Sequence, residues 1–138
     1  MDKTIGLTGL SGAIAGYLGN FLETKGSKVV SLDTLTRQLS RPVILPEDEP
    51  MDWVIHFGAH TSIEESWSDP FKYYTSNSIG TLAALEIAHL NKANFIYISS
   101  YVYGEPQYVP INEAHPVDAS NPYMGSKLIS EAICIEVS

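Results

Sequence analysis

"TGLSGAIAG", residues 8–16, places three glycines directly behind the short apolar run "KTIGL" at residues 3–7. Residues 3–8, which contain this run, are typical of a buried strand, and the residues that follow, as far as Gly26, have the pattern of a helix. A glycine-rich turn between a strand and a helix is where an α/β sheet holds a pyrophosphate. Gly9 permits a tight turn, and Gly12 lets the backbone approach phosphate without a Cβ in the way. The stretch predicts a dinucleotide site, with a ligand-free turn as the alternative.

Strand and helix patterns alternate through the rest of the chain. Further strands are expected at 28–33, 52–57 and 94–100. Asp69-Pro70 has the N-cap and first-turn signature of a helix that runs to about Leu90, and Asn121-Pro122 opens a last helix. The segment 34–51 contains no convincing helix. This alternation predicts an α/β fold, a Rossmann-type doubly wound parallel sheet in one domain that spans residues 1–138.

Composition excludes several classes of partner. The chain has 138 residues, a net charge of −8 and no cluster of Lys or Arg, which argues against nucleic acid. No apolar stretch is long enough to span a bilayer, and no export signal is recognisable, so no membrane partner is expected. The single cysteine, Cys134, suits a reducing compartment. We therefore expect a cytoplasmic location, and no metal, because the His and carboxylate residues lack metal-ligand spacing.

A carboxylate follows the second expected strand. Asp33 stands at the position where it could accept hydrogen bonds from the adenosine ribose hydroxyls. The same charge would repel a 2′-phosphate, so NAD is the expected cofactor and NADP the less favoured one. Arg37 nearby keeps NADP open as an alternative.

A second group of polar residues lies far along the chain. Tyr123 and Lys127 are four residues apart, which places them on one face of the last helix. An ammonium beside a phenol favours the phenolate. Ser99 and Ser100 end the fourth expected strand, at the sheet edge where ligands bind in doubly wound folds. A hydroxyl, a phenol and a dinucleotide site together suit proton and hydride transfer between an alcohol and a ketone.

These residues resemble the extended short-chain dehydrogenases/reductases, in the NAD-dependent epimerase/dehydratase group that acts on nucleotide sugars. "TGLSGAIA" is similar to the family's TGxxGxxG, with Ala15 in place of the last glycine. The other matches follow in order along the chain, and they are "DWVIHFGAHTSIEES", "NSIGT", "ISSYVYG" and "INEAHPVDASNPYMGSK".

The resemblance implies a role for each matched position. Tyr123 would be the general acid or base, Lys127 would hold the nicotinamide ribose, and Ser99 would hydrogen-bond the reacting oxygen. The expected cofactor-binding residues are Gly9, Ser11, Gly12, Ala13, Ile14, Asp33, Phe57, Gly58, Ala59, His60, Asn77, Tyr123 and Lys127.

The expected activity is that of an NAD-dependent oxidoreductase or epimerase that acts on a nucleotide sugar by hydride transfer. Dehydratase and decarboxylase relatives carry an acidic residue two positions after the catalytic Ser or Thr, whereas this chain has Tyr101. The resemblance therefore favours an epimerase or keto-reductase. The alternative is an NAD-binding or scaffold module without turnover.

The sequence departs from the family in two places. The segment 34–51 is short, which leaves the adenine contacts open, and the chain ends near the Tyr-Lys helix. The chain therefore resembles the N-terminal part of a longer protein, without the C-terminal substrate domain, and alone it is expected to bind cofactor without turning over a nucleotide sugar.

Two further expectations concern surfaces and histidines. The helices at 71–90 and 122–138 are apolar on more than one face, so we expect them to form a homodimer interface. His56 is interpreted as a core or hydrogen-bonded histidine, whereas His89 and His115 are expected to be solvated.

Overall fold

The computed structural model describes residues 3–33 and 50–137 of the chain. The elements, in chain order, are β1 (Thr4–Thr8), α1 (Ala13–Thr24), β2 (Lys28–Ser31), β3 (Trp53–His56), α3 (Ile63–Ser68), α4 (Pro70–Tyr73), the π-helical segment η1 (Tyr74–Ile79), α5 (Gly80–Asn91), β4 (Asn94–Tyr97) and α6 (Pro122–Val137). Each of the four expected strands is present, and each is shorter than its expected range. The segment 34–51, which was expected to contain no helix, lies largely outside the described residues, and so does Arg37.

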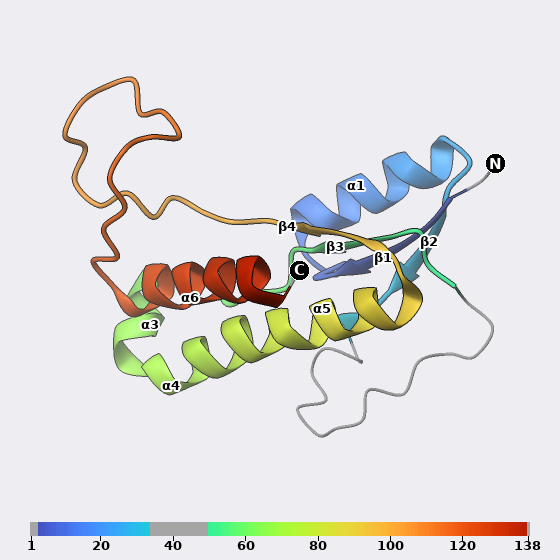
Figure 1. Cartoon of the computed structure of the whole chain (residues 1–138), viewed down its shortest axis with the longest axis horizontal. Helices are drawn as coiled ribbons and strands as arrows, with labels where there is room; N and C mark the ends of the chain where they lie inside the picture. Colours follow the sequence, from blue (N-terminus) through green and yellow to red (C-terminus); the bar gives the residue numbers. More distant parts are fainter. Residues whose placement is uncertain (1–2, 34–49, 138) are drawn as a thin grey trace.

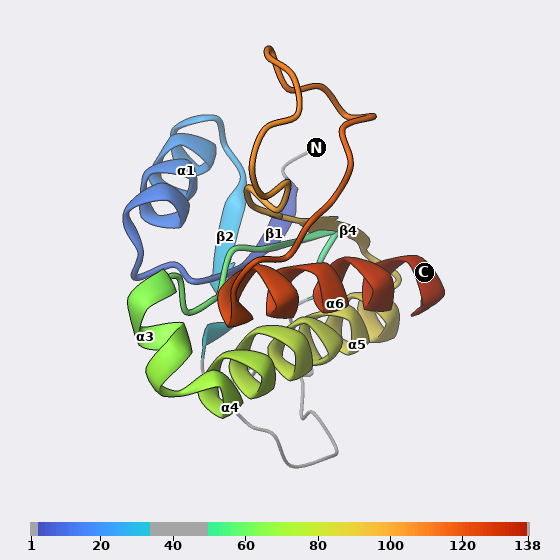
Figure 2. The same ribbon diagram turned by 90° about the vertical axis from the view of Figure 1, so that its left-hand side faces the viewer.

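The strands form a parallel sheet in the order β2-β1-β3-β4. Ile5 in β1 pairs with Val29 on one side and with Trp53 on the other. Helix α1 lies on one face of the sheet, and α5 and α6 lie side by side on the other (Figure 1). The view in Figure 2 shows the same layers from the end of the sheet. The predicted Rossmann-type doubly wound sheet is confirmed.

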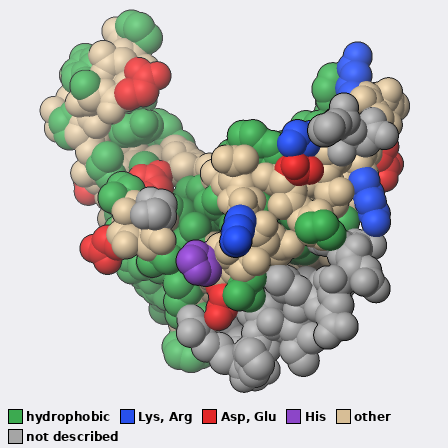
Figure 3. Space-filling model, turned by 45° about the vertical axis from the view of Figure 1, so that its right-hand side comes forward, with side chains coloured by type: hydrophobic (Ala, Val, Ile, Leu, Met, Phe, Trp, Pro, Cys, Tyr) green, Lys and Arg blue, Asp and Glu red, His purple; other side chains and the backbone are tan. Residues whose placement is uncertain are grey.

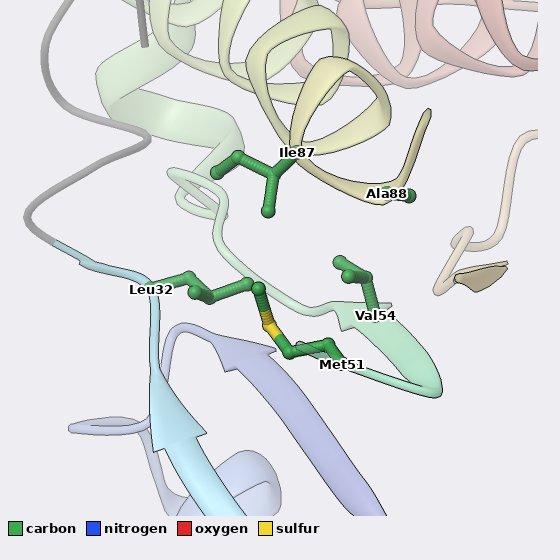
Figure 4. Close-up of a cluster of buried hydrophobic side chains, with 5 residues drawn as sticks. All are labelled: Leu32, Met51, Val54, Ile87 and Ala88. Atoms are coloured by element: carbon green, nitrogen blue, oxygen red, sulfur yellow. The ribbon is translucent and has the colours of Figure 1, made fainter. Parts of the chain in front are cut away.

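A cluster of buried apolar side chains joins the sheet to α5 (Figure 4). Its members are Leu32, Met51, Val54, Ile87 and Ala88. A Cβ at Gly6 would lie 2.6 Å from the Met51 sulfur, so glycine in β1 leaves room for this packing. Burial of the four larger side chains, all but Ala88, contributes about 1.5–3 kcal/mol each, which holds α5 against the strands that carry the site.

The expected helix from Asp69 to Leu90 consists of α4, η1 and α5 in succession. The Asp69 carboxylate accepts the Lys72 N–H at 3.0 Å, and Pro70 follows at the first helical position, as the sequence predicted. The π-helical segment packs against α6 and contributes Ser76 to the pocket described below, and such segments often occur at functional sites. Over the described residues, no helix is both long and apolar enough to cross a membrane.

The segment between β4 and α6 projects from the body of the molecule (Figures 1 and 3). His115 lies inside this loop and is 3% exposed, so the expectation that it is solvated is wrong. Its Nε2 accepts the Gln107 N–H at 3.0 Å, and its Nδ1 pairs with the Pro116 carbonyl at 2.8 Å. The Tyr103 and Tyr108 rings pack against it, with centroids 5.6 and 4.7 Å away, and cover it from solvent. His89 is exposed, as expected.

Candidate dinucleotide site

The turn between β1 and α1 has the geometry that its glycines predicted. Gly9 has a φ of 72°, and the Gly12 N–H donates to the Gly9 carbonyl at 2.8 Å. Gly12 is the N-cap of α1, and no side chain caps this end. A helix N-terminus presents N–H groups and a partial positive charge, which suits a bound anion. The turn can therefore hold a phosphate group.

The turn opens into a pocket of about 560 Å³ at the carboxyl ends of β1 and β3. Ten of the expected cofactor-binding residues line it: Gly9, Ser11, Gly12, Ala13, Ile14, Asp33, Phe57, Gly58, Ala59 and His60. The sequence had not assigned to it the further lining residues Ala15, His56, Thr61, Ser76 and Gly80. Asn77, Tyr123 and Lys127 do not line this pocket.

Asp33 lies at the pocket wall, just after β2, and accepts a hydrogen bond from the Gly9 N–H. The carboxylate thereby ties the end of β2 to the phosphate turn. Its position next to the turn is the one expected for a residue that binds an adenosine ribose.

The expected catalytic residues are only partly brought together. The Tyr123 hydroxyl donates to the Ser100 hydroxyl at 2.8 Å. Ser99 is exposed and donates to the Glu131 carboxylate in α6. The structure therefore places Ser100, not Ser99, next to Tyr123. The sequence analysis named both serines at the end of the fourth strand and assigned the catalytic hydroxyl to Ser99.

Lys127 lies on α6 one turn after Tyr123 and is 4% exposed. Its Nζ donates to the Ile98 carbonyl at 2.7 Å and lies 4.3 Å from the centroid of the Tyr97 ring. Burial lowers the pKa of Lys127 to about 8, because an ammonium loses hydration there. The amine is thus directed at the end of β4.

Asn77 connects the pocket to α6. Its side chain accepts the His60 N–H at 2.8 Å and donates to the His60 carbonyl at 3.1 Å and to the Ser126 hydroxyl at 2.9 Å. Asn77 is 1% exposed, so the structure gives it the role of a bridge.

Tyr73, which the sequence analysis had not singled out, is fully buried between the pocket wall and α6. Its ring centroid lies 5.7 Å from that of His60 and 6.4 Å from that of Tyr123, the latter in an edge-on arrangement. The candidate acid-base residue is therefore joined to the pocket by packed side chains. Over residues 3–33 and 50–137, no His, Cys, Asp or Glu side chains are grouped as a metal site.

Comparison with protein families gives a match to the family described as GDP-mannose 4,6 dehydratase over residues 44–138. The chain belongs to this family, and the expected membership of the NAD-dependent epimerase/dehydratase group is confirmed.

Individual relatives agree with this assignment. UDP-glucose 4-epimerase 2 of Arabidopsis thaliana is 42% identical over 88 residues, which are 62% of this chain and 25% of the relative. The UDP-glucose 4-epimerase of Lacticaseibacillus casei is 32% identical over 151 residues, which cover 94% of this chain and 45% of the relative. The chain thus spans between a quarter and about half the length of these relatives.

Solved structures share the fold. The UDP-glucose 4-epimerase of Bifidobacterium longum, solved with NAD+ and UDP, matches with a TM-score of 0.80 and 30% identity over 97% of this chain and 48% of that chain. The RMD protein of Pseudomonas aeruginosa, solved with NADPH, matches with a TM-score of 0.80 and 30% identity over 99% of this chain and 48% of that chain.

Proposed function

We propose that these residues form the cofactor-binding part of an NAD-dependent enzyme that acts on a nucleotide sugar by hydride transfer. The observation that carries the proposal is the pocket at the Gly9–Gly12 turn, with the Asp33 carboxylate at its wall. The turn and the N-terminus of α1 suit the pyrophosphate, and Asp33 suits the ribose of the adenosine. Asp33 also favours NAD over NADP, because its charge opposes a 2′-phosphate.

The chemistry proposed for the site divides between the cofactor and the chain. NAD, when bound, supplies a nicotinamide ring that takes up or returns a hydride. Tyr123 holds and moves the proton at its phenolic oxygen, and Lys127 supplies a cation one helical turn away on α6. Ser100 lies 2.8 Å from that phenolic oxygen, so it joins Ser99 as a candidate for the hydroxyl that binds the reacting oxygen of the sugar.

An epimerase or keto-reductase is the proposed reaction type. Counted from Ser99, Tyr101 occupies the position at which dehydratases of the family carry an acid, and its hydroxyl donates to the Gly104 carbonyl at 2.5 Å. A phenol whose proton is donated to a carbonyl in this way is a poor base for a carbon-bound proton. The names of the epimerase relatives support the same type.

The partners proposed are a nucleotide sugar and a second copy of the chain. Apolar side chains are exposed on the two helices expected to form the dimer, namely Phe71, Ile79, Leu90, Ile129 and Val137. Helices α5 and α6, which carry Leu90, Ile129 and Val137, pack against each other and lie side by side (Figure 2).

Calorimetric titration with NAD and NADP tests the cofactor, and incubation with NAD and UDP-, GDP- and dTDP-sugars tests the activity. Tighter binding of NAD, with a change in the sugar detected by chromatography, supports the proposal. Binding of NAD without any turnover is the result expected of this chain alone. If a longer form encoded by the same gene also binds NAD without turnover, the alternative of a binding module is supported. Absence of NAD binding contradicts both.

A further inference from the structure

His56 occupies the point where β1, β3 and α5 meet, and it is 2% exposed. Its Nδ1 lies 2.7 Å from the Thr8 hydroxyl oxygen at the end of β1. Its Nε2 lies 3.1 Å from the Thr81 hydroxyl oxygen in α5. The ring is packed between elements, with the Phe95 and Tyr97 rings 6.3 and 6.0 Å from its centroid.

The hydrogen-bond partners fix the position of each proton. Thr81 donates its only hydroxyl proton to the Asn77 carbonyl at 2.7 Å, so its oxygen must accept from His56 Nε2–H. Burial, with the charge of Lys127 as a second cause, lowers the pKa of His56 to about 3, so the ring is neutral near pH 7. Nδ1 of a neutral ring that is protonated at Nε2 can only accept, and its donor is the Thr8 hydroxyl.

The Thr8 hydroxyl also determines how the two walls of the pocket meet. Its oxygen accepts the Gly58 N–H at 2.8 Å. A Cβ at Gly9 would lie 3.0 Å from the Gly58 nitrogen, so the phosphate turn and the chain after β3 touch at this point. Gly9, His56 and Gly58 all line the pocket. If the Thr8 hydroxyl pointed its proton toward Gly58, its oxygen could no longer accept the Gly58 N–H.

We infer that His56, as the neutral Nε2–H tautomer, is a positioning residue that orients the Thr8 hydroxyl to accept from Gly58 and thereby sets the width of the pocket proposed for NAD. The link to NAD rests on the proposed function. The tautomer and the Thr8–Gly58 hydrogen bond do not depend on it, so the two parts can be tested separately.

Two measurements on the unliganded chain test the hydrogen bonds. Long-range nitrogen–proton NMR spectra at pH 7 report which ring nitrogen of His56 carries the proton. Hydrogen exchange reports the protection of the Gly58 amide. We expect the Nε2–H form, and exchange of Gly58 at least tenfold faster in Thr8→Val and in His56→Leu. An Nδ1–H tautomer, or unchanged exchange of Gly58 in both variants, overturns the inference.

Calorimetry with NAD tests the consequence for the pocket. His56→Asn keeps a short amide oxygen that can accept from Thr8, so its NAD dissociation constant should stay within threefold of that of the wild type. His56→Leu and Thr8→Val should each weaken NAD binding at least tenfold. Val54→Ala, a cavity-forming change in the same strand, controls for a general loss of stability and should leave NAD affinity within threefold.

The combined outcomes separate the two proposals. If His56→Leu does not fold, the comparison remains between Thr8→Val, which should bind NAD at least tenfold more weakly, and His56→Asn, which should bind it within threefold of the wild type. Equal NAD affinity in Thr8→Val and the wild type overturns the role in positioning, even where Gly58 exchanges faster. A wild-type chain that binds no NAD contradicts the proposed function, whereas the tautomer and the Gly58 exchange continue to decide the inference about His56.

Discussion

The phenolic hydroxyl of Tyr123 donates to the hydroxyl of Ser100 at 2.8 Å, which ties α6 to the chain that leaves β4. Ser99, one residue earlier, faces Glu131 instead. Both partners lie on α6, with Glu131 two turns after Tyr123, so the adjacent serines bond different positions along the same helix. The hydroxyl next to the candidate acid-base residue is therefore decided by where α6 lies along the segment that follows β4.

We predict that Ser100→Ala changes the environment of Tyr123 and that Ser99→Ala does not. Loss of a partly buried hydrogen bond should cost about 0.5–1.5 kcal/mol of unfolding free energy, and the exposed Ser99 contact should cost less. Urea unfolding measures the stability, and the carbon-13 resonance of the Tyr123 ring carbon that bears the hydroxyl measures its environment. A shift of that resonance in Ser99→Ala alone would contradict the assignment.

Asp33 should select NAD and also stabilise the phosphate turn. Asp33→Ala should weaken NAD binding by about 1–3 kcal/mol, because it removes an acceptor for the ribose and the partner of Gly9. Asp33→Asn is the matched control, since its amide oxygen can still accept from Gly9 while the charge that opposes a 2′-phosphate is gone. For Asp33→Asn, calorimetry should show a smaller ratio between the NADP and NAD dissociation constants than for the wild type. Tighter binding of NADP by the wild type would refute the prediction.

The first half of the site could be predicted from the sequence because its determinants are local. Gly9 needs its positive φ for the turn, and Asp33 follows the next strand, so a short stretch of chain specifies both. The start of helix α3 is also encoded locally. Ser62 and Glu65 have the spacing of a capping box, and the Ser62 hydroxyl accepts the Glu65 N–H at 3.1 Å.

The second half depends on contacts between distant residues, which no local pattern encodes. The choice of Ser100 over Ser99 requires the position of α6 relative to the end of β4. Burial of His115 arises from a loop without periodicity, which folds back so that Gln107 reaches the ring. The bridge from Asn77 to Ser126 likewise joins η1 to α6 across most of the domain's second half.

Lys127 should make stability depend on pH. Its pKa in the folded chain is about 8, below its ordinary value of 10.5. Between these values the unfolded chain binds the proton and the folded chain does not, so the unfolding free energy rises with pH across this window. Below pH 8 both states are protonated and this contribution is lost. The wild type should gain on the order of 2 kcal/mol relative to Lys127→Met between pH 7.5 and 10, as measured by urea unfolding. A constant difference would contradict the burial of the charge.

The proposed dimer should break when charge enters its apolar surface. Ile79→Glu and Ile129→Glu each place a carboxylate on an exposed apolar position of the two helices, and desolvating it would oppose association. Analytical ultracentrifugation at micromolar concentration should show a dimer for the wild type and monomers for both variants. Val109→Glu, on the projecting loop and 80% exposed, is the control and should stay dimeric. A monomeric wild type would count against the interface.

The reaction type gives the last prediction. A sugar 4,6-dehydratase must remove a proton from a sugar carbon, and its family members use an acidic residue at the position of Tyr101. In this chain the Tyr101 hydroxyl is engaged with the Gly104 carbonyl, and the Tyr103 ring packs edge-on against it at 5.8 Å. We therefore expect any product formed in reactions with NAD and nucleotide sugars to be an epimerised or reduced sugar, with no 4-keto-6-deoxy product detected by mass spectrometry. Tyr101→Phe removes the phenolic oxygen but keeps the ring, so it should leave any turnover within threefold. A 4-keto-6-deoxy product that disappears in Tyr101→Phe would show that this phenol serves as the base after all.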